Sequence, residues 1–403
     1  MYARREHLWP VVDDSLTRFT AEVFGCLPRT DQRRWARAYL SGLLSVEGRK
    51  SPQRMARAVP SATSASGGLQ QFINSSPWEW SPARRVLADT VERLMPVRTW
   101  TVGVLNIPKR GTRSVGVHRR FVADYGRTVN SQLGLGMFLS SGDSTVPVDW
   151  DLFLDGSWAE DAERRRQARI PAEVGARPPW TSVLKLTDTM LARRPGPPAV
   201  LAVDLRTVAN DVSRLAGELA LRGVDFVIEV NPSQRVAVAV PARPSIGAVR
   251  VEEQTTVSEV WRHNHLWLAA AGADVEGRAQ RVTASVRSIQ LPGPELAPRS
   301  RPRRYRLVAQ RSSDGRQQQR YWITSIMNRP VEAVLDAAGQ VARTEDVLRQ
   351  LAFDLGALDF EGRSYPGWHH HMTMVSAASV YRTLIAGDDR WQAGLPAAGR
   401  RPA

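Results

Sequence analysis

Residues 98–155 contain a succession of short strand patterns, and this feature limits the possible folds more than any other. The segments "WTVGVLNI", "RRFVADYG", "SQLGLGMFLSS" and "STVPVDWDLFL" follow one another along the chain. Successive short strands joined by tight turns are typical of an antiparallel meander. Residues 1–95 instead space their apolar side chains in helical steps, so the meander begins a second structural unit.

Alternating strands and helices follow the meander. The segment "PPAVLAVDL" (197–205) is a short apolar run that reaches Asp204, which is typical of a strand buried on both faces. A helical segment, "NDVSRLAGELALRG", and a further strand, "VDFVIEV", come next. A meander followed by such units has the order of a ribonuclease H-like core. We therefore predict an α/β (α+β) fold with a ribonuclease H-like core, an N-terminal helical domain and a β-rich insertion.

The same patterns predict the boundaries of the parts. The segment before the last helices is rich in Pro and β-forming residues, which favours an insertion there. The predicted parts are a basic, helical, DNA-binding domain at 1–95, the first part of the core at 96–231, the β-rich insertion at 232–330, the C-terminal core helices at 331–390 and a disordered tail at 391–403.

The chain is strongly basic, and the excess of positive charge is uneven. The formal net charge is +15, and residues 1–120 hold 20 Arg and Lys against 9 Asp and Glu. Such an excess in one part of a chain is typical of a protein that binds a polyanion. GC-rich coding would explain the preference for Arg over Lys, but it would not explain the excess over acids. We therefore predict double-stranded DNA as a partner.

A single cysteine and the lack of long apolar runs exclude other classes. Cys26 has no second cysteine with which to form a disulfide or a Cys-based zinc site, which fits a reducing cytoplasm. We expect Cys26 in the core, on the apolar face of the helix "SLTRFTAEVFGCL". No apolar run reaches the roughly 18 residues that a membrane span needs. We expect no secretory signal, no membrane partner and a cytoplasmic, nucleoid-associated protein.

Five further stretches match one family. They are "LQQFINSSPWEW" (69–80), "IPKRGTRSVGV" (107–117), "VPVDWDLFLDGSW" (146–158), "LRGVDFVIEV" (221–230) and "LDFEGRSYPGWHHHMTMV" (358–375). With these motifs the chain resembles insertion-sequence transposases of the Asp-Asp-Glu (DDE) superfamily, over about residues 15–385. The resemblance implies a ribonuclease H-like fold, Mg²⁺ as cofactor and DNA as substrate.

The resemblance also implies a catalytic set of three carboxylates, which hold two Mg²⁺ ions for strand cleavage and transfer. It places the second Asp at Asp204 and the Glu at Glu345. The first Asp of the family falls where this chain has Gly103 and Val104, so the set is incomplete. Asp204 and Glu345 would then be remnants of a weak metal site, and Mg²⁺ would matter only if activity remains. Without the resemblance, Asp204 is equally well a strand-end acid and Glu345 a solvated helix acid.

Two other acids, Asp124 and Asp149, could supply the third carboxylate, but Asp149 belongs to a family motif and is more readily structural. The run of three histidines (369–371) cannot easily share one metal ion, because consecutive helical residues point in different directions; a structural or phosphate-contacting role is favoured. Trp78 and Trp80 could stack on bases, but hydrophobic packing is the favoured interpretation.

We expect DNA contacts from basic side chains in three segments: a helix near the N-terminus, the loop after the first core strand, and the last family motif. These residues are Arg33, Arg34, Arg37, Lys109, Arg110, Arg113 and Arg363.

Together these features predict a transposase-family DNA-binding protein with impaired catalysis. It would act as a transcriptional regulator or as a dominant-negative partner of intact copies, and homodimer formation is left open. One alternative is an active DDE transposase that performs Mg²⁺-dependent strand cleavage and transfer. Another is a relic without a selected role, which the persistent apolar patterns disfavour.

Overall fold

The structure is a computed structural model. It describes residues 14–58, 65–193, 197–204, 206–207, 211–240, 251–262, 267–273, 279–292, 303–312 and 319–386. The predicted tail at 391–403 lies outside these residues. Within the described ranges, every helix is too short or too polar to cross a membrane.

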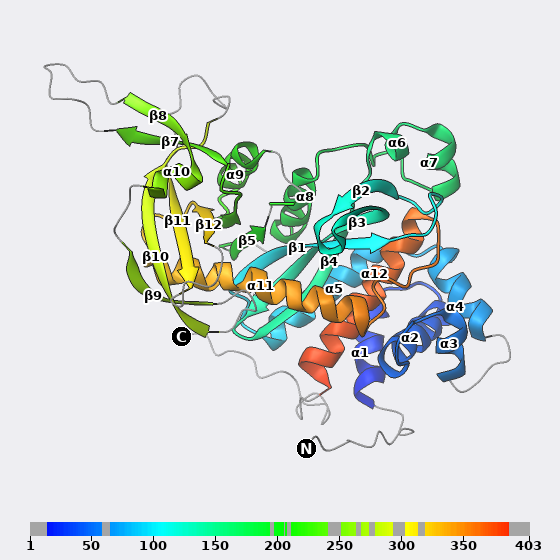
Figure 1. The fold of residues 1–403 in the computed structure, drawn as a ribbon. Coiled ribbons are helices and arrows are strands. Elements are labelled where there is room, and N and C mark those ends of the chain that lie inside the picture. The colour runs from blue at the N-terminus through cyan, green and yellow to red at the C-terminus, as the bar shows by residue number, and fades with distance from the viewer. Residues whose placement is uncertain are drawn as a thin grey trace, which may run out of the picture.

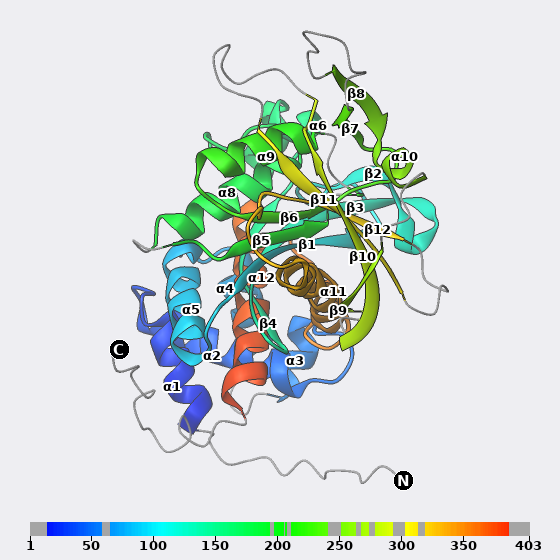
Figure 2. The same cartoon turned by 90° about the vertical axis from the view of Figure 1, so that its left-hand side faces the viewer.

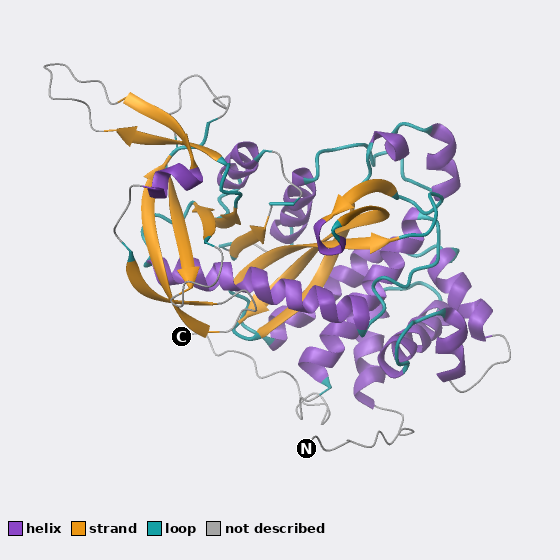
Figure 3. Ribbon diagram, in the orientation of Figure 1, coloured by secondary structure: helices purple, strands orange, loops and turns teal. Residues whose placement is uncertain are grey.

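The N-terminal part is helical, as predicted, and Figure 3 shows its helices gathered at one end of the molecule. Its helices are α1 (Asp14–Phe24), α2 (Thr30–Ser45), α3 (Pro52–Ala58), α4 (Ala65–Asn74) and α5 (Trp80–Leu94). Leu16, Phe19 and Val23 recur on one face of α1 and are buried. Their buried side chains belong to the larger of two hydrophobic clusters, which also includes core residues such as Val102 and Trp368.

The prediction for Cys26 is wrong, because its side chain is exposed. Helix α1 ends at Phe24, so Cys26 lies in the turn that follows rather than on the apolar face of the helix. Leu27, one residue further, does enter the core. The helical spacing therefore holds for most of the segment but stops before the cysteine.

Among the described residues, ten strands form one mixed sheet, whose neighbouring strands follow the order β2-β3-β1-β5-β6-β12-β11-β10-β9, with β4 also paired to β3. The strands are β1 (Thr99–Pro108), β2 (His118–Val122), β3 (Arg127–Ser141), β4 (Ser144–Leu152), β5 (Val200–Asp204), β6 (Phe226–Glu229), β9 (Leu268–Ala273), β10 (Ala279–Ile289), β11 (Tyr305–Ser312) and β12 (Arg320–Thr324). A separate pair consists of β7 (Arg235–Val240) and β8 (Val251–Thr256).

The first half of the sheet has the predicted ribonuclease H-like arrangement. Strands β1, β3 and β4 form the antiparallel meander, and β5 and β6 then run parallel to β1. Parallel neighbours must be connected by a crossover, here through the helices between them. The predicted fold class is confirmed.

Four strands of the β-rich segment at 232–330 continue this sheet, while β7 and β8 of the same segment form the separate pair. Strand β12 pairs antiparallel with β6, and β11, β10 and β9 follow in order. Figure 1 shows these strands, in yellow and yellow-green, at the end of the sheet away from the N-terminal helices. The segment is therefore an insertion in chain order that adds strands to the core. Whether its boundaries delimit a domain stays a prediction.

Helices cover both faces of the sheet, as Figure 2 shows. The remaining helices are η1 (Ala123–Tyr125), α6 (Gly156–Ala159), α7 (Ala162–Ala168), α8 (Trp180–Leu191), α9 (Val212–Leu221), α10 (Val257–Arg262), α11 (Val331–Phe353), α12 (Tyr365–Val380) and η2 (Tyr381–Ile385). Ala202 of β5 packs in the cluster formed with α11, whereas Leu201 and Val203 belong to the cluster that includes α9. Side chains alternate along a strand, so α11 and α9 lie on opposite faces.

Candidate active site

Gly103, the position that the resemblance assigns to the first acid, lies on β1, opposite α11. A Cβ atom on Gly103 would lie 2.7 Å from Cγ2 of Thr344 and 2.8 Å from Cδ1 of Leu348. Real Cβ atoms almost never approach other atoms so closely. The side chains of α11 therefore fill the space in which an Asp side chain would project. Val104, the next residue, points to the other face of the sheet because strand side chains alternate.

Asp204 lies beside this position, at the carboxyl end of β5. Val102 is paired with Val203 in parallel register, so Gly103 and Asp204 are the next residues of the two strands. The Asp204 carboxylate accepts two hydrogen bonds from the guanidinium group of Arg206, at 3.0 Å from Nε and 2.8 Å from Nη2, and a third from the Arg206 backbone N–H. Both carboxylate oxygens are thus bound by one guanidinium group, the strong bidentate arrangement.

Glu229 is a functional candidate that the sequence analysis missed. It is the register partner of Asp204 on β6, and its side chain is fully buried (0% exposed). Arg320 of β12 donates to both oxygens, at 2.9 and 2.6 Å, and Nη1 of Arg206 lies 3.2 Å from Oε1. The signal that could have found Glu229 is an acid at the end of the strand "VDFVIEV", one strand beyond Asp204.

Glu345 comes to the same place from α11. Burial raises the pKa of its carboxyl to about 7, and the negative charges of Asp204 and Glu229 raise it further, whereas Arg320 and Arg206 oppose the shift. These interactions place Glu345 beside the four other side chains. We call the group the acid–arginine cluster; its members are Asp204, Arg206, Glu229, Arg320 and Glu345.

The cluster does not fit a divalent metal ion. Mg²⁺ needs free, hard carboxylate oxygens, and the oxygens of Asp204 and Glu229 already accept from guanidinium groups. Within the described part of the chain, His, Cys, Asp and Glu side chains nowhere form a group of three that could hold a metal. The structure brings Asp204 and Glu345 into one cluster, but Arg206 pairs with Asp204 and Arg320 pairs with Glu229 there.

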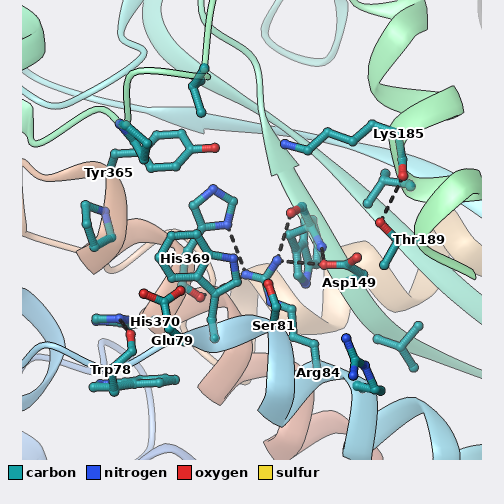
Figure 4. A pocket seen from close by; sticks show the side chains of 18 of the residues that line it. Trp78, Glu79, Ser81, Arg84, Asp149, Lys185, Thr189, Tyr365, His369 and His370 are labelled. Atoms are coloured by element: carbon teal, nitrogen blue, oxygen red, sulfur yellow. Dashed lines mark hydrogen bonds and ion pairs between the residues drawn. The ribbon is translucent and has the colours of Figure 1, made fainter. Parts of the chain in front are cut away.

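Asp149 lies apart from the acid–arginine cluster. It lies on β4 and pairs with the buried Arg84 of α5 at 2.7 Å (Figure 4). The side chain of Asp124 lies outside the described residues.

The three histidines are buried, and each has different neighbours. His369 contacts Arg84 and stacks on Trp80, with ring centroids 4.5 Å apart. His370 lies between the carbonyl oxygens of Ile73 and Trp78, at 2.9 and 2.7 Å. Trp78 itself is buried and stacks on His370, in agreement with the packing role favoured for it, whereas Trp80 is partly exposed.

His371 joins three parts of the chain. It accepts a hydrogen bond at Nδ1 from the Tyr39 hydroxyl of α2 and donates from Nε2 to the Gly356 carbonyl, both at 2.9 Å. Burial lowers the pKa of its imidazole to about 4. The histidine run therefore belongs to the packing around α12.

The predicted DNA contacts lie in different surroundings. Arg34, Arg110, Arg113 and Arg363 are exposed, while Arg33, Arg37 and Lys109 are half-buried. Arg33 donates to the Leu27 carbonyl at 2.9 Å.

The loop after β1 lies against the last motif. Lys109 donates to the Phe360 carbonyl at 2.6 Å, and burial lowers its pKa to about 8. The Val115 N–H donates to the Arg363 carbonyl at 3.1 Å. The loop that carries Arg110 and Arg113 therefore lies next to the segment that carries Arg363.

The sheet order and the position of the acids define a ribonuclease H-like protein of the DDE type. The chain belongs to the DDE superfamily endonuclease family, whose sequence model matches residues 22–288. The match includes Asp204 and Glu229 and ends before α11. No curated protein matches the chain. The family implies a DNA substrate, and its members typically use a divalent metal.

Proposed function

We propose that this protein binds double-stranded DNA but does not cleave it, because arginine side chains occupy the carboxylates of its former metal site. The observation that carries the proposal is the pair of bidentate contacts from Arg206 to Asp204 and from Arg320 to Glu229. An arginine side chain does not lose its proton in proteins, so it keeps competing with any metal for these oxygens.

The glycine on β1 supports the same conclusion. A metal ion that bridges the acids would lack the carboxylate of the first Asp, and Gly103 has no room for one. A transition-state interaction worth several kcal/mol corresponds to a loss of rate of about 10³-fold or more. Within the cluster, Glu345 is the carboxylate without an arginine pair, and its pKa of about 7 leaves a large fraction of it neutral at pH 7.

A basic hairpin supports DNA binding. From Pro108 to Ser131, at the end of β1 and through β2 to β3, Asp124 is the single acid among several basic residues: Lys109, Arg110, Arg113, Arg119, Arg120 and Arg127. Phe121 on β2 is 65% exposed, and Tyr125 in η1 is 41% exposed. Exposed aromatic rings among basic side chains are typical of nucleic-acid surfaces.

The hairpin leaves the sheet at the same edge as the acid–arginine cluster. Strands β1 and β5 are parallel, so their carboxyl ends meet at one edge. DNA held by the hairpin would then lie near Asp204, as in a cutting enzyme, without being cut. This arrangement suits a nucleoid-associated regulator of transcription, or a partner that forms inactive dimers with intact transposase copies.

The test combines a binding assay and a cleavage assay on the full chain. Duplex DNA should bind with an affinity that falls steeply with salt, because phosphate contacts release counterions. The same protein should give no cleavage and no strand transfer with Mg²⁺ or Mn²⁺. Cleavage that depends on Mg²⁺ and is abolished by Asp204→Ala would instead establish the active-transposase alternative.

A further inference from the structure

A cavity of about 900 Å³ lies on the other side of the sheet from the acid–arginine cluster. Asp149 and Asp151 of β4 point toward α5 and α8, where they pair with Arg84 and Lys185. Trp150, between them, points to the opposite face and lies over Gly136, the register partner of Gly103. The cavity between β4, α5, α8 and the start of α12 is therefore separate from the former catalytic centre.

A buried hydrogen-bond donor without an acceptor lines this cavity. Nη2 of Arg84 lies 3.1 Å from Nδ1 of His369, and since arginine can only donate, Nδ1 accepts. Burial lowers the pKa of His369 well below its ordinary value, and the charges of Arg84 and Lys185 lower it further. The neutral ring then carries its proton on Nε2. That atom has no hydrogen-bond partner among the described residues, and the residue is only 2% exposed.

Two further donors face the same space. In Figure 4 the hydroxyl of Tyr365 and the ammonium group of Lys185 point toward one another across the cavity. Tyr365 is 2% exposed, whereas the Lys185 side chain is half-exposed and 2.5 Å from Asp151. Arg85 and Arg169 also line the cavity. The lining includes more basic than acidic side chains, which favours an anionic ligand.

The wall also offers an aromatic surface. The indole of Trp80 lines the cavity, is partly exposed, and is stacked on His369 with an interplanar angle of 6°. Apolar side chains of α8 and of the segment before it, Leu186, Met190 and Val174, complete this wall. Binding sites for small molecules are typically of this size, mostly apolar, with a few polar groups that fix orientation.

We propose that this cavity binds a nucleoside monophosphate. The phosphate accepts hydrogen bonds from the His369 N–H, the Tyr365 hydroxyl and the Lys185 ammonium group, and the base lies against Trp80. The phosphate supplies the acceptor that His369 lacks, and an unsatisfied buried donor is costly. The site uses no member of the acid–arginine cluster, so the proposal stands apart from the absence of cleavage.

The proposal is tested by isothermal titration calorimetry, which measures the affinity of the full chain for dAMP, deoxyadenosine and inorganic phosphate. We expect dAMP to bind at least about tenfold more tightly than deoxyadenosine, since the nucleoside leaves the buried donors without acceptors. Tyr365→Phe removes one hydroxyl, and Lys185→Gln changes a half-exposed side chain; each should weaken dAMP binding about five- to tenfold. Tyr39→Phe is the matched control, because its hydroxyl bonds to His371 outside the cavity.

Three results would overturn the proposal: no dAMP binding at millimolar concentration, equal affinity for dAMP and deoxyadenosine, or unchanged affinity in both the Tyr365→Phe and Lys185→Gln variants. A 5′-phosphorylated oligonucleotide identifies the source of the ligand. Competition with dAMP, absent for the unphosphorylated oligonucleotide, would support the site and assign it to the end of a DNA strand. Lack of competition alongside tight dAMP binding would support a free nucleotide.

Discussion

Gly103 on β1 and Thr344 on α11 are so closely packed that a Cβ on the glycine would lie 2.7 Å from the threonine methyl carbon. The hydroxyl of Thr344 also lies 2.5 Å from that of Thr101, two residues earlier on β1, and both side chains are buried. The helix that carries Glu345 is therefore packed closely against β1 at Thr101 and Gly103. This packing leaves little space for a larger side chain at position 103.

Restoring the acid should damage the protein. Gly103→Asp places a side chain against Thr344 and Leu348 and buries a charge, so we expect destabilisation by at least about 1–3 kcal/mol and no gain of cleavage. Urea unfolding measures the change. Gly67→Asp on α4 is the control, because a Cβ there has nothing within 4 Å; it should change stability by less than about 0.5 kcal/mol. A Gly103→Asp variant as stable as the control would contradict the packing described.

Removing an arginine should leave a buried charge without its main partner. Arg320→Met should destabilise the fold by about 3 kcal/mol at pH 7, since Glu229 is fully buried and keeps only the longer contact with Arg206. Adding Glu229→Gln should restore much of that loss. Urea unfolding of the two single variants and the double variant gives the coupling energy. Additive effects would show that Arg320 and Glu229 do not interact.

Glu345 should lower stability at high pH. Its folded-state pKa of about 7 lies above the ordinary value of 4.5, so the folded state binds the proton more tightly and stability falls as the pH rises from 4.5 through 7. Glu345→Gln should therefore stabilise the protein by roughly 1–3 kcal/mol at pH 8 and much less at pH 4.5. Asp336→Asn, exposed on the same helix, is the control. An equal effect at both pH values would contradict the shift.

His371 should have the opposite effect on the pH profile. Its pKa is about 4 in the folded state and 6.5 in the reference state, so between these values the unfolded chain binds the extra proton. Its contribution, up to roughly 3 kcal/mol, is present above pH 6.5 and lost as the pH falls through 4. Unfolding in urea at several pH values should show this loss, and His371→Gln should flatten the profile. If stability fell equally with decreasing pH in the unaltered protein and in the His371→Gln variant, the loss could not be due to His371.

The hairpin should account for part of the salt dependence of DNA binding. Arg119 and Arg127 are exposed on β2 and β3. Replacing either by Ala should reduce the slope of log affinity against log salt by about 0.9 if it contacts one phosphate. Arg349→Ala is the control, because that exposed side chain pairs with Asp346 within α11. If Arg349→Ala reduced the slope as much as Arg119→Ala, DNA would bind over the basic surface in general and not at the hairpin.

Local patterns and family motifs identified much of this architecture. Short apolar segments predicted the strand that contains Gly103 and the strand that reaches Asp204. The order of these segments along the chain predicted the meander and the parallel strands that follow it. The three histidines face different surroundings, as consecutive helical residues must. That all of them are buried could not be predicted, because it depends on the elements that surround α12.

The arginines of the cluster were not predicted, for a physical reason. Arg320 contacts Glu229 only because β12 pairs antiparallel with β6, although the two residues are 91 positions apart in sequence. Such a register is set by long-range packing rather than by the local pattern. The prediction for Cys26 was wrong for a local reason. Helix α1 ends at Phe24, so Cys26 lies in the following turn and not on the apolar face of the helix.

Binding of Mn²⁺ tests the central claim most directly, because it does not depend on knowing the DNA sequence. Titration of the full chain with Mn²⁺, followed by electron paramagnetic resonance, should show no saturable site that responds to Asp204→Asn or Glu345→Gln. Two tightly bound ions per chain, both lost in the Asp204→Asn variant, would contradict the account, because arginine would then not exclude metal from these carboxylates.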